Sequence, residues 1–286
     1  MTSASPPAAL LVPCDPTRPR AADPSFAADV AAARERGIPV GLYDDMNHKL
    51  VRSPAPTSDS EAAAALRGWM MTTAQYAKLH ASCAARGVRL LTDPDQYARA
   101  HHLPGWQATF AELTPHSVWL PLPVDVNEAV RTVAQLAGSA IVKDYVKTVK
   151  HLWDTAVFIP DTKDPVAVRD VIKAFLRERD DQLQGGLVFR TFERWQHEEL
   201  RSWWLHGELV LLSAHPDTPH ATPAHTLPIA QLSQAVRTLG CPLVTVDLVR
   251  STDGDWRVVE VGDAQVSGLP STTEPGRLLD ALITPS

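Results

Sequence analysis

Short apolar runs separated by alanine-rich stretches set the pattern at the start of the chain. The run Ala8–Pro13 predicts a buried strand. Asp23, which is followed by a proline, predicts the start of a helix that ends near Arg36. Ile38–Tyr43 then predicts a second strand. This β-α-β order favours a parallel pair of strands.

The same rules predict the later elements. Helical spacing, acidic caps and glycine stops predict helices over residues 72–87, 93–102, 125–137, 164–182, 229–239 and 276–283. Strands are predicted over residues 88–91, 140–146, 153–159 and 187–192. One hairpin is predicted over Leu200–Leu212 with its turn at His206-Gly207, and another turns at Asp253-Gly254. Clustered prolines between Pro104 and Pro123 suggest a domain boundary.

The second hairpin carries acidic residues in apolar surroundings. With a two-residue turn at Asp253-Gly254, the register places Asp247 directly opposite Glu260. Like charges with Cβ atoms about 4.5–5.5 Å apart destabilise a sheet unless a proton or a cation lies between them. Asp263 follows and is a candidate third oxygen ligand. Such a set favours a hard ion such as Mg²⁺; the alternative is a solvated hairpin face with ordinary acids.

Lysines are few and concentrated. Of the 27 basic residues 20 are Arg and 7 are Lys, and Lys143, Lys147 and Lys150 fall within eight residues. Lys143 ends an apolar run, so its ammonium needs a partner such as phosphate. The alternative is a basic surface loop. Cations and paired carboxylates in one chain suggest Mg²⁺–nucleotide chemistry.

Composition restricts the class of protein. The 286 residues, 44% of them hydrophobic, suffice for about two domains with packed cores. A net charge of −6 gives no global basic field for nucleic acid. We expect no membrane span and no secretory signal, because the chain has neither a long apolar run nor a basic N-terminal region before one. The three cysteines, Cys14, Cys83 and Cys241, lie far apart, which suggests a reducing cytoplasm.

Several catalytic motifs are absent. The sequence has no GxxxxGK[ST], no GxGxxG after a strand and no GxSxG. Cys14 is interpreted as a small buried thiol rather than a nucleophile. The run His215, His220 and His225 matches no helical metal motif and is interpreted as loop histidines.

In their order and spacing these segments resemble the ATP-grasp superfamily, most strongly over Ser139–Pro270. The matching parts are the strand with a phosphate-binding lysine (IVKDYVKTVK), the hinge strand (GGLVFRTF), Glu199-Leu-Arg201 and the acidic hairpin (VDLVRSTDGDWRVVEVGD). The segment that starts at Arg67 (RGWM) resembles a compact bacterial subgroup associated with RNA repair or peptide-type ligation. The expected fold class is α/β, of the α+β ATP-grasp type. It would comprise an N-terminal β-α-β domain (residues 1–115), a central subdomain with the phosphate loop (116–184) and a C-terminal subdomain with hinge and metal site (185–286).

The resemblance implies roles for individual residues. Those expected to bind ATP are Lys143 at the α- and β-phosphates; Lys147, Thr148 and Lys150 in the loop over the phosphates; Arg190, Thr191 and Phe192 at the adenine hinge, chiefly through backbone groups; Glu199 at the sugar or the hinge; and Arg201 at the γ-phosphate or acyl phosphate. The expected metal ligands are Asp247, Glu260 and Asp263, the expected catalytic residues are Lys143, Arg201 and Arg250, and the expected substrate contacts are Arg67 and Trp69. The chain departs from the family where Gly262 replaces the usual asparagine after Glu260, and where the phosphate loop lacks glycines.

The resemblance thus implies an ATP-dependent ligase with Mg²⁺ that joins a small-molecule carboxylate to an amine or thiol. It would act through an acyl phosphate and release ADP and phosphate. The alternatives are a kinase for a small molecule or an RNA end, and a non-catalytic module that binds nucleotide or a partner. RNA is suggested by the subgroup alone. The sequence does not indicate the oligomeric state.

Overall fold

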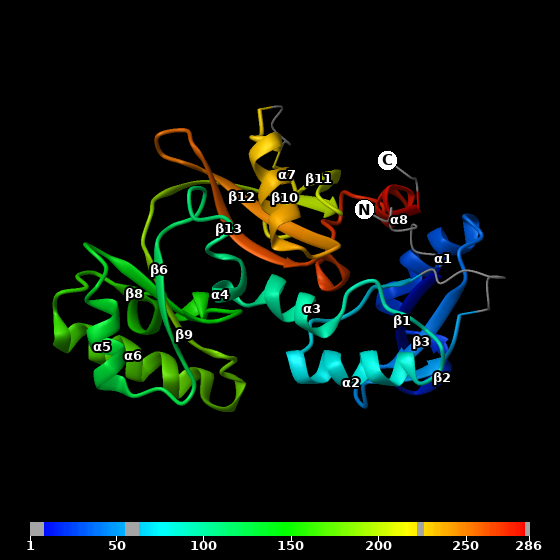
Figure 1. Ribbon diagram of the computed structural model, residues 1–286, viewed down its shortest axis with the longest axis horizontal. Coiled ribbons are helices and arrows are strands. Elements are labelled where there is room, and N and C mark those ends of the chain that lie inside the picture. The colour runs from blue at the N-terminus through cyan, green and yellow to red at the C-terminus, as the bar shows by residue number, and fades with distance from the viewer. Residues whose placement is uncertain (1–8, 55–62, 222–225, 284–286) are drawn as a thin grey trace. The chain divides into compact units, whose positions relative to one another are not determined.

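The structure is a computed structural model that describes residues 9–54, 63–221 and 226–283 (Figure 1). It divides into two compact units. The first contains residues 1–100, 198–248 and 261–286, and the second contains residues 101–197 and 249–260. The division into three parts, 1–115, 116–184 and 185–286, stays a prediction. Over the described ranges, no helix combines the length and apolar character that crossing a membrane requires.

The first unit begins with a small sheet. Its strands are β1 (Ala9–Asp15), β2 (Arg18–Ala22), β3 (Val40–Asp44), β4 (Lys49–Arg52) and β5 (Ala64–Leu66). Their order is β2-β1-β3-β4, and β5 also pairs with β1. β1 and β3 are parallel, with Leu10 opposite Val40. The predicted parallel pair is therefore confirmed, whereas β2, β4 and β5 were not predicted.

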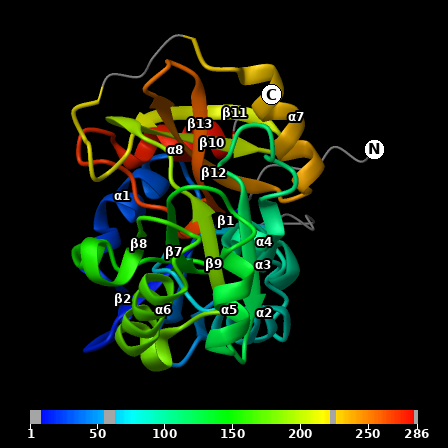
Figure 2. The same cartoon turned by 90° about the vertical axis from the view of Figure 1, so that its left-hand side faces the viewer.

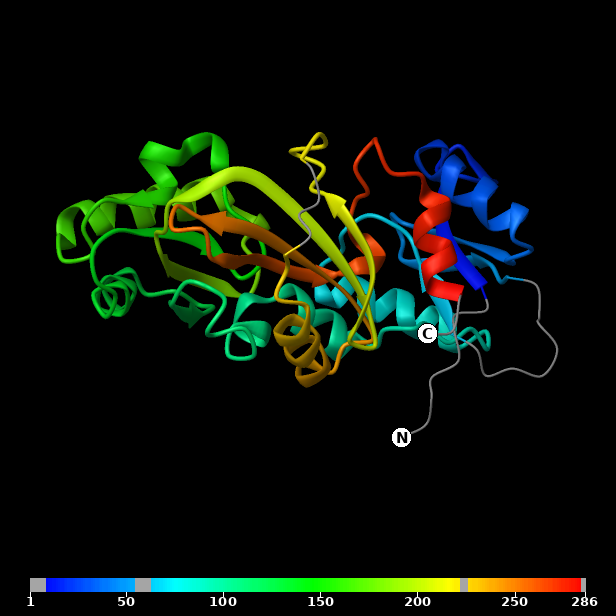
Figure 3. The ribbon, with the colours of Figure 1, turned by 90° about the horizontal axis from the view of Figure 1, so that it is seen from above.

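Alternation along β1 divides its side chains between two cores. The helices that cover the sheet are α1 (Ala27–Glu35), α2 (Thr73–Ala84), α3 (Pro94–His101) and α8 (Pro275–Ile283). Leu10 and Val12 pack with residues of α1 and α8, while Leu11 packs with residues of α2 and α3. Figure 3 shows α8, in red, beside the blue segment that contains α1. The sheet is thus covered on both faces by helices from both ends of the chain.

The second unit contains an antiparallel sheet with helices on one face. Its main elements are α4 (Leu103–Trp106), β6 (Ser117–Pro121), α5 (Val126–Val133), β7 (Ala140–Asp144), β8 (Phe158–Ile159), α6 (Pro165–Arg179) and β9 (Gly186–Thr191). The strand order is β6-β9-β7-β8. Val142 and Phe189 pack against α5 and α6, which lie side by side in Figure 2. Because side chains alternate, Lys143 and Arg190 lie on the opposite face.

A third sheet contains β10 (Trp195–Leu205), β11 (Glu208–Ala214), β12 (Leu243–Ser251) and β13 (Trp256–Asp263), in the order β11-β10-β12-β13. The predicted hairpin at His206-Gly207 is confirmed, since Leu205 pairs with Glu208. Gly207 has a φ of 88°, a conformation that glycine adopts without strain. α7 (Ile229–Leu239) precedes β12, as predicted. β10 and β12 are neighbours although about 40 residues separate them along the chain.

Three predicted details are wrong. Residues 88–91 form only an isolated bridge from Leu90 to Ala64. Trp153–Val157 is a π-helical turn, so the strand predicted at 153–159 is reduced to the two residues of β8. The last hairpin has a longer turn than predicted: the Ser251 N–H donates to the Asp255 carbonyl at 2.8 Å, and the Gly254 N–H donates to the Ser251 carbonyl at 3.0 Å. The argument that placed Asp247 directly opposite Glu260 assumed a two-residue turn and therefore loses its basis.

Candidate functional site

An arginine–aspartate pair lies on the third sheet, within the first unit. Arg201 on β10 donates from Nε to one oxygen of Asp247 on β12 at 2.7 Å, and from Nη2 to the other at 2.8 Å. Its Nη1 also donates to the Gly268 carbonyl at 3.0 Å. Both side chains are largely buried. The fork fixes the orientation of the Asp247 carboxylate and balances its charge.

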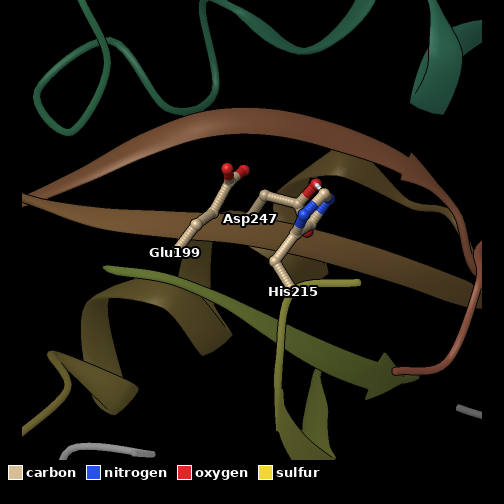
Figure 4. A group of neighbouring side chains, drawn as sticks. All are labelled: Glu199, His215 and Asp247. Atoms are coloured by element: carbon tan, nitrogen blue, oxygen red, sulfur yellow. Dashed lines mark ion pairs between the residues drawn. The ribbon is translucent and has the colours of Figure 1, made fainter. Parts of the chain in front are cut away.

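Two further side chains lie close to Asp247. Glu199 is two residues before Arg201 on β10, and His215 follows β11, where its N–H donates to the Glu199 carbonyl at 2.9 Å. One potential ligand atom from each of Glu199, His215 and Asp247 lies within 4.8 Å of the others. Figure 4 shows these three side chains gathered on one side of the strands. Two carboxylates and an imidazole here form a set of side chains that could hold a metal ion.

The imidazole of His215 is oriented by a backbone group. The Asp217 N–H donates to its Nδ1 at 3.1 Å, so a neutral ring carries its proton on Nε2. Nε2 lies 3.7 Å from Oδ2 of Asp247. In this orientation the ring presents an N–H to Asp247, which leaves Glu199 and Asp247 as the oxygen ligands for a hard cation. The interpretation of His215 as an ordinary loop histidine is therefore wrong, and His225 lies outside the described residues.

The second unit contributes a buried lysine. Lys143 on β7 is only 7% exposed, and it pairs across the sheet with Val188. Burial lowers the pKa of its ammonium group, and the carboxylate of Glu260, a half-buried residue of β13, acts in the opposite direction. The structure thus brings together the predicted phosphate ligand and one of the predicted metal ligands within one unit.

The hinge residues have structural partners. The guanidinium of Arg190 is buried and donates to the carbonyls of Val258 at 2.7 Å and Val259 at 2.5 Å, and to Oγ1 of Thr114 at 2.5 Å. Burial lowers the pKa of Arg190 to about 10. The side chain therefore holds β13 beside the open face of the second sheet rather than facing solvent.

The backbone of the hinge strand is also engaged. The N–H of Thr191 donates to the His116 carbonyl at 2.9 Å, and that of Phe192 donates to the Ser139 carbonyl at 3.0 Å. These two donors are committed to the protein, contrary to the expectation that they contact adenine. The ring of Phe192 lies 5.8 Å from Trp153 and 5.1 Å from Phe158, centroid to centroid. This aromatic cluster, which follows the phosphate loop, is a feature that the sequence patterns did not indicate.

The predicted phosphate loop leads from β7 into helical turns. Lys147 and Lys150 are exposed, and the Oγ1 of Thr148 donates back to the Val142 carbonyl at 3.1 Å. A 3-10 turn covers Lys150–Leu152 and continues into the π-helical turn. The loop therefore has regular local structure in place of the glycines that such loops usually contain.

Arg250 lies near the tip of the last hairpin. Its guanidinium is 4.6 Å from the centroid of the Trp256 ring and donates to the Gly254 carbonyl at 3.2 Å. These contacts stabilise the turn, and none of them supports the predicted catalytic role.

Asp263 and Arg67 are buried and have structural partners. Asp263 is fully buried, and both of its oxygens accept N–H groups of Gln265, at 2.8 and 3.3 Å. The Nη1 of Arg67 donates to the Ser267 carbonyl at 2.8 Å, and its Nε donates to Asp29 at 3.2 Å. These surroundings argue against the predicted roles of Asp263 as a metal ligand and of Arg67 as a substrate contact.

Trp69 keeps an available surface. Its side chain is 47% exposed, and its ring packs edge-on against Phe26 with a centroid distance of 5.0 Å. Of the two expected substrate contacts, only Trp69 can meet a ligand without losing buried contacts.

Solved structures with this fold are ATP-grasp proteins. A RimK domain ATP-grasp protein from Sphaerobacter thermophilus matches with a TM-score of 0.61 at 17% identity, over 96% of this chain and 97% of that one. D-cycloserine synthetase DcsG matches with a TM-score of 0.59 at 17% identity, over 96% and 98%. ATP-grasp ligase PsnB, complexed with a precursor peptide and AMPPNP, matches with a TM-score of 0.59 at 16% identity, over 99% and 98%. At these identities the likeness shows the ATP-grasp fold, which confirms the predicted fold class.

The family comparison concerns the sequence itself. No curated protein matches the chain. A family model described as an ATP-grasp domain, the third family of its clade, matches residues 131–282, which is more than half of the chain. That range includes Lys143, Arg201, Asp247 and Glu260. The predicted resemblance is confirmed, and the chain belongs to this family of the ATP-grasp superfamily.

Proposed function

We propose that the protein is an ATP-dependent ligase that joins a carboxylate to an amine or thiol through an acyl phosphate. The observation that carries the proposal is the buried Lys143 with the carboxylate of Glu260 acting on its ammonium group. A buried ammonium is costly unless an anion compensates it, and a nucleotide phosphate would add that compensation. A carboxylate beside it would be repelled by phosphate unless a cation bridged them, and a divalent ion fits that position.

Each unit would contribute to the reaction. Lys143 would hold the α- and β-phosphates, and the exposed Lys147 and Lys150, with Thr148, would neutralise the outer phosphates. Glu260 and Asp247 would hold Mg²⁺, which supplies charge neutralisation on the phosphates when bound.

The substrate carboxylate oxygen would attack the γ-phosphorus, the bond to the β,γ-bridging oxygen would break, and ADP would leave. The amine or thiol would then attack the acyl carbon, lose a proton and expel phosphate. Arg201, already oriented by Asp247, would meet the transferring phosphoryl group. Trp69 would contact the substrate, and Phe192 the adenine.

The relatives favour ligation over the alternatives. Two of the three structures named above are described as a synthetase and as a ligase, one of the latter's complexes containing a precursor peptide. The expected substrates are therefore a small carboxylate with an amine, or a peptide. The three cysteines are buried and form no disulfide, which supports a cytoplasmic location.

The test is an ADP-release assay with paired panels of carboxylates and amines. Lys143→Ala and Glu260→Ala are expected to abolish turnover, whereas Lys173→Ala, which changes an exposed lysine on α6, is expected to leave it unchanged. Unchanged turnover in both site variants would overturn the proposal. A phosphorylated product that persists would instead identify a kinase. Nucleotide binding without turnover on any pair would favour a non-catalytic module.

A further inference from the structure

The residue after Lys143 has a fully buried carboxylate. Asp144 is 0% exposed, and its side chain lies on the face of β7 opposite to that of Lys143, because neighbouring residues of a strand alternate. An ionised carboxylate in such a place is strongly destabilising unless charge and hydrogen bonds compensate it. Compensation on this scale implies that the position of Asp144 is closely determined.

One oxygen of Asp144 shapes the start of the phosphate loop. Oδ1 accepts the backbone N–H of Val146 at 2.7 Å and that of Lys147 at 2.5 Å. The Asp144 N–H in turn donates to the Lys147 carbonyl at 2.9 Å. The chain therefore reverses within four residues, and the reversal fixes where Lys147 lies relative to Lys143.

The other oxygen ties this turn to the rest of the second unit. Oδ2 accepts two bonds from Arg179 at the end of α6, from Nε at 3.0 Å and Nη2 at 2.6 Å. It also lies 3.4 Å from the donating N–H of Gln184. Tyr145, inside the turn, donates its N–H to the Gln184 carbonyl at 3.2 Å, and its carbonyl accepts from the N–H of Leu103 at 2.8 Å. The turn is held from both sides.

The pairing with Arg179 also has an electrostatic consequence. A two-bond fork from a guanidinium balances the charge of Asp144 on its own face of β7. The carboxylate is therefore not the direct partner of the neighbouring Lys143, whose ammonium remains available to an anion on the other face. The loop has no glycine between Lys143 and Val157, so this carboxylate-centred turn provides the reversal that glycines would otherwise allow.

We propose that Asp144 and Arg179 form a positioning pair that sets Lys143 and Lys147 at the spacing required by the phosphates of the nucleotide. The inference rests on the proposed function, since it assumes that these lysines bind phosphate. It predicts that the pair affects nucleotides through their phosphates and not through their base.

The test compares Mg²⁺–ADP with adenosine, by calorimetry on the full chain. Asp144→Asn keeps an oxygen for the turn but places an N–H₂ opposite Arg179. The dissociation constant for Mg²⁺–ADP is expected to rise about tenfold, within the roughly 100-fold that a displacement of about 1 Å can cost. The dissociation constant for adenosine is expected to stay unchanged.

Asp15→Asn is a matched control. Asp15 accepts the N–H groups of the residues two and three positions ahead, at 2.8 and 3.1 Å, and a two-bond fork from Arg18. It therefore has the same local chemistry as Asp144, but it lies in the first unit. This control is expected to bind Mg²⁺–ADP as the wild type does. If Asp144→Asn does not fold, Arg179→Lys keeps the charge, removes the fork and gives the same comparison.

Each outcome decides the matter. A folded Asp144→Asn or Arg179→Lys protein with unchanged Mg²⁺–ADP affinity would overturn the positioning role while leaving the proposed function intact. Equal weakening of ADP and adenosine would also overturn it, because the pair would then support the unit in general. A wild type that binds no Mg²⁺–ADP would overturn the proposed function itself, and the inference with it.

Discussion

Asp263→Asn separates a structural carboxylate from a metal ligand. In the folded protein, burial raises the pKa of Asp263 from 3.8 to about 6, while hydrogen bonds from Gln265 act in the opposite direction. The native state therefore binds this proton more tightly than the unfolded chain does. Between pH 3.8 and about 6 the unfolded chain has lost the proton and the native state retains it, so this residue makes the protein less stable as the pH rises through that window. A shift of about two pKa units corresponds to about 3 kcal/mol once the pH is above both values.

The measurement is urea unfolding of the wild type and of Asp263→Asn at pH 5 and pH 7.5. Part of the loss has already occurred at pH 5, and the share that remains between the two pH values is about 1.4 kcal/mol. The wild type is expected to lose that much more stability than the variant, because the variant has no carboxyl group to titrate there. Taking the difference between the two proteins cancels the other titrating groups, provided that their surroundings are unchanged.

The same variant tests the ligand assignment. A buried structural carboxylate predicts that Asp263→Asn still binds Mg²⁺–nucleotide. Equal pH dependence in the two proteins would refute the reasoning from burial. Loss of Mg²⁺-dependent binding in a folded variant would restore Asp263 to the metal site, against the geometry with Gln265.

Other expected outcomes concern the two units separately. With Mg²⁺, a non-hydrolysable ATP analogue at 100 times its dissociation constant is expected to raise Tm by several degrees, since such binding stabilises by about 2.7 kcal/mol; EDTA or Glu260→Ala should remove the shift, and its persistence in both would contradict the metal role. Arg201→Met leaves the buried Asp247 carboxylate without its fork and is expected to cost about 3 kcal/mol in urea unfolding. A cost below about 1 kcal/mol would mean that His215 and Glu199 compensate. Trp69→Ala is expected to lower kcat/KM for the substrate without changing KM for ATP, because the ring is half exposed; an equal change in both constants would place it elsewhere.

The parts of the fold that the sequence predicts are those with strong local signals. β1 and β3 are apolar runs, and α6 begins at an aspartate cap followed by proline. β2, in contrast, is Arg18–Ala22, a polar edge strand that contains a proline, so it has neither the apolar alternation nor the composition of a central strand. β5 lies in an alanine run that gives no period of two. Edge position and tertiary pairing, rather than propensity, determine these strands.

The site shows the same limit. Lys143 and the acids of the last hairpin are recognisable because their types and order match the family, but their partners depend on sheet neighbours that are far apart in sequence. Arg201 meets Asp247 because β10 lies beside β12. His215 was within reach of prediction, since the hairpin at His206-Gly207 brings the end of β11 to the start of the Glu199-Leu-Arg201 segment. The chemistry of the residues was readable, whereas the contacts that commit Asp263 and Arg67 to the interior were not.

The division between arginine and lysine follows from these contacts. Three arginines form two-bond forks with carboxylates: Arg179 with Asp144, Arg201 with Asp247 and Arg257 with Glu193. A planar fork fixes two side chains in one geometry, whereas an ammonium is a compact charge that can follow a moving anion. Lys143 lies on the open face of its sheet with Glu260 as its strongest attractive neighbour, and Lys147 lies exposed on the loop. The scarcity of lysine in a chain rich in arginine therefore has a physical reason: arginines hold the carboxylates of the framework in place, and lysines remain where a phosphate that arrives, transfers and leaves must be neutralised.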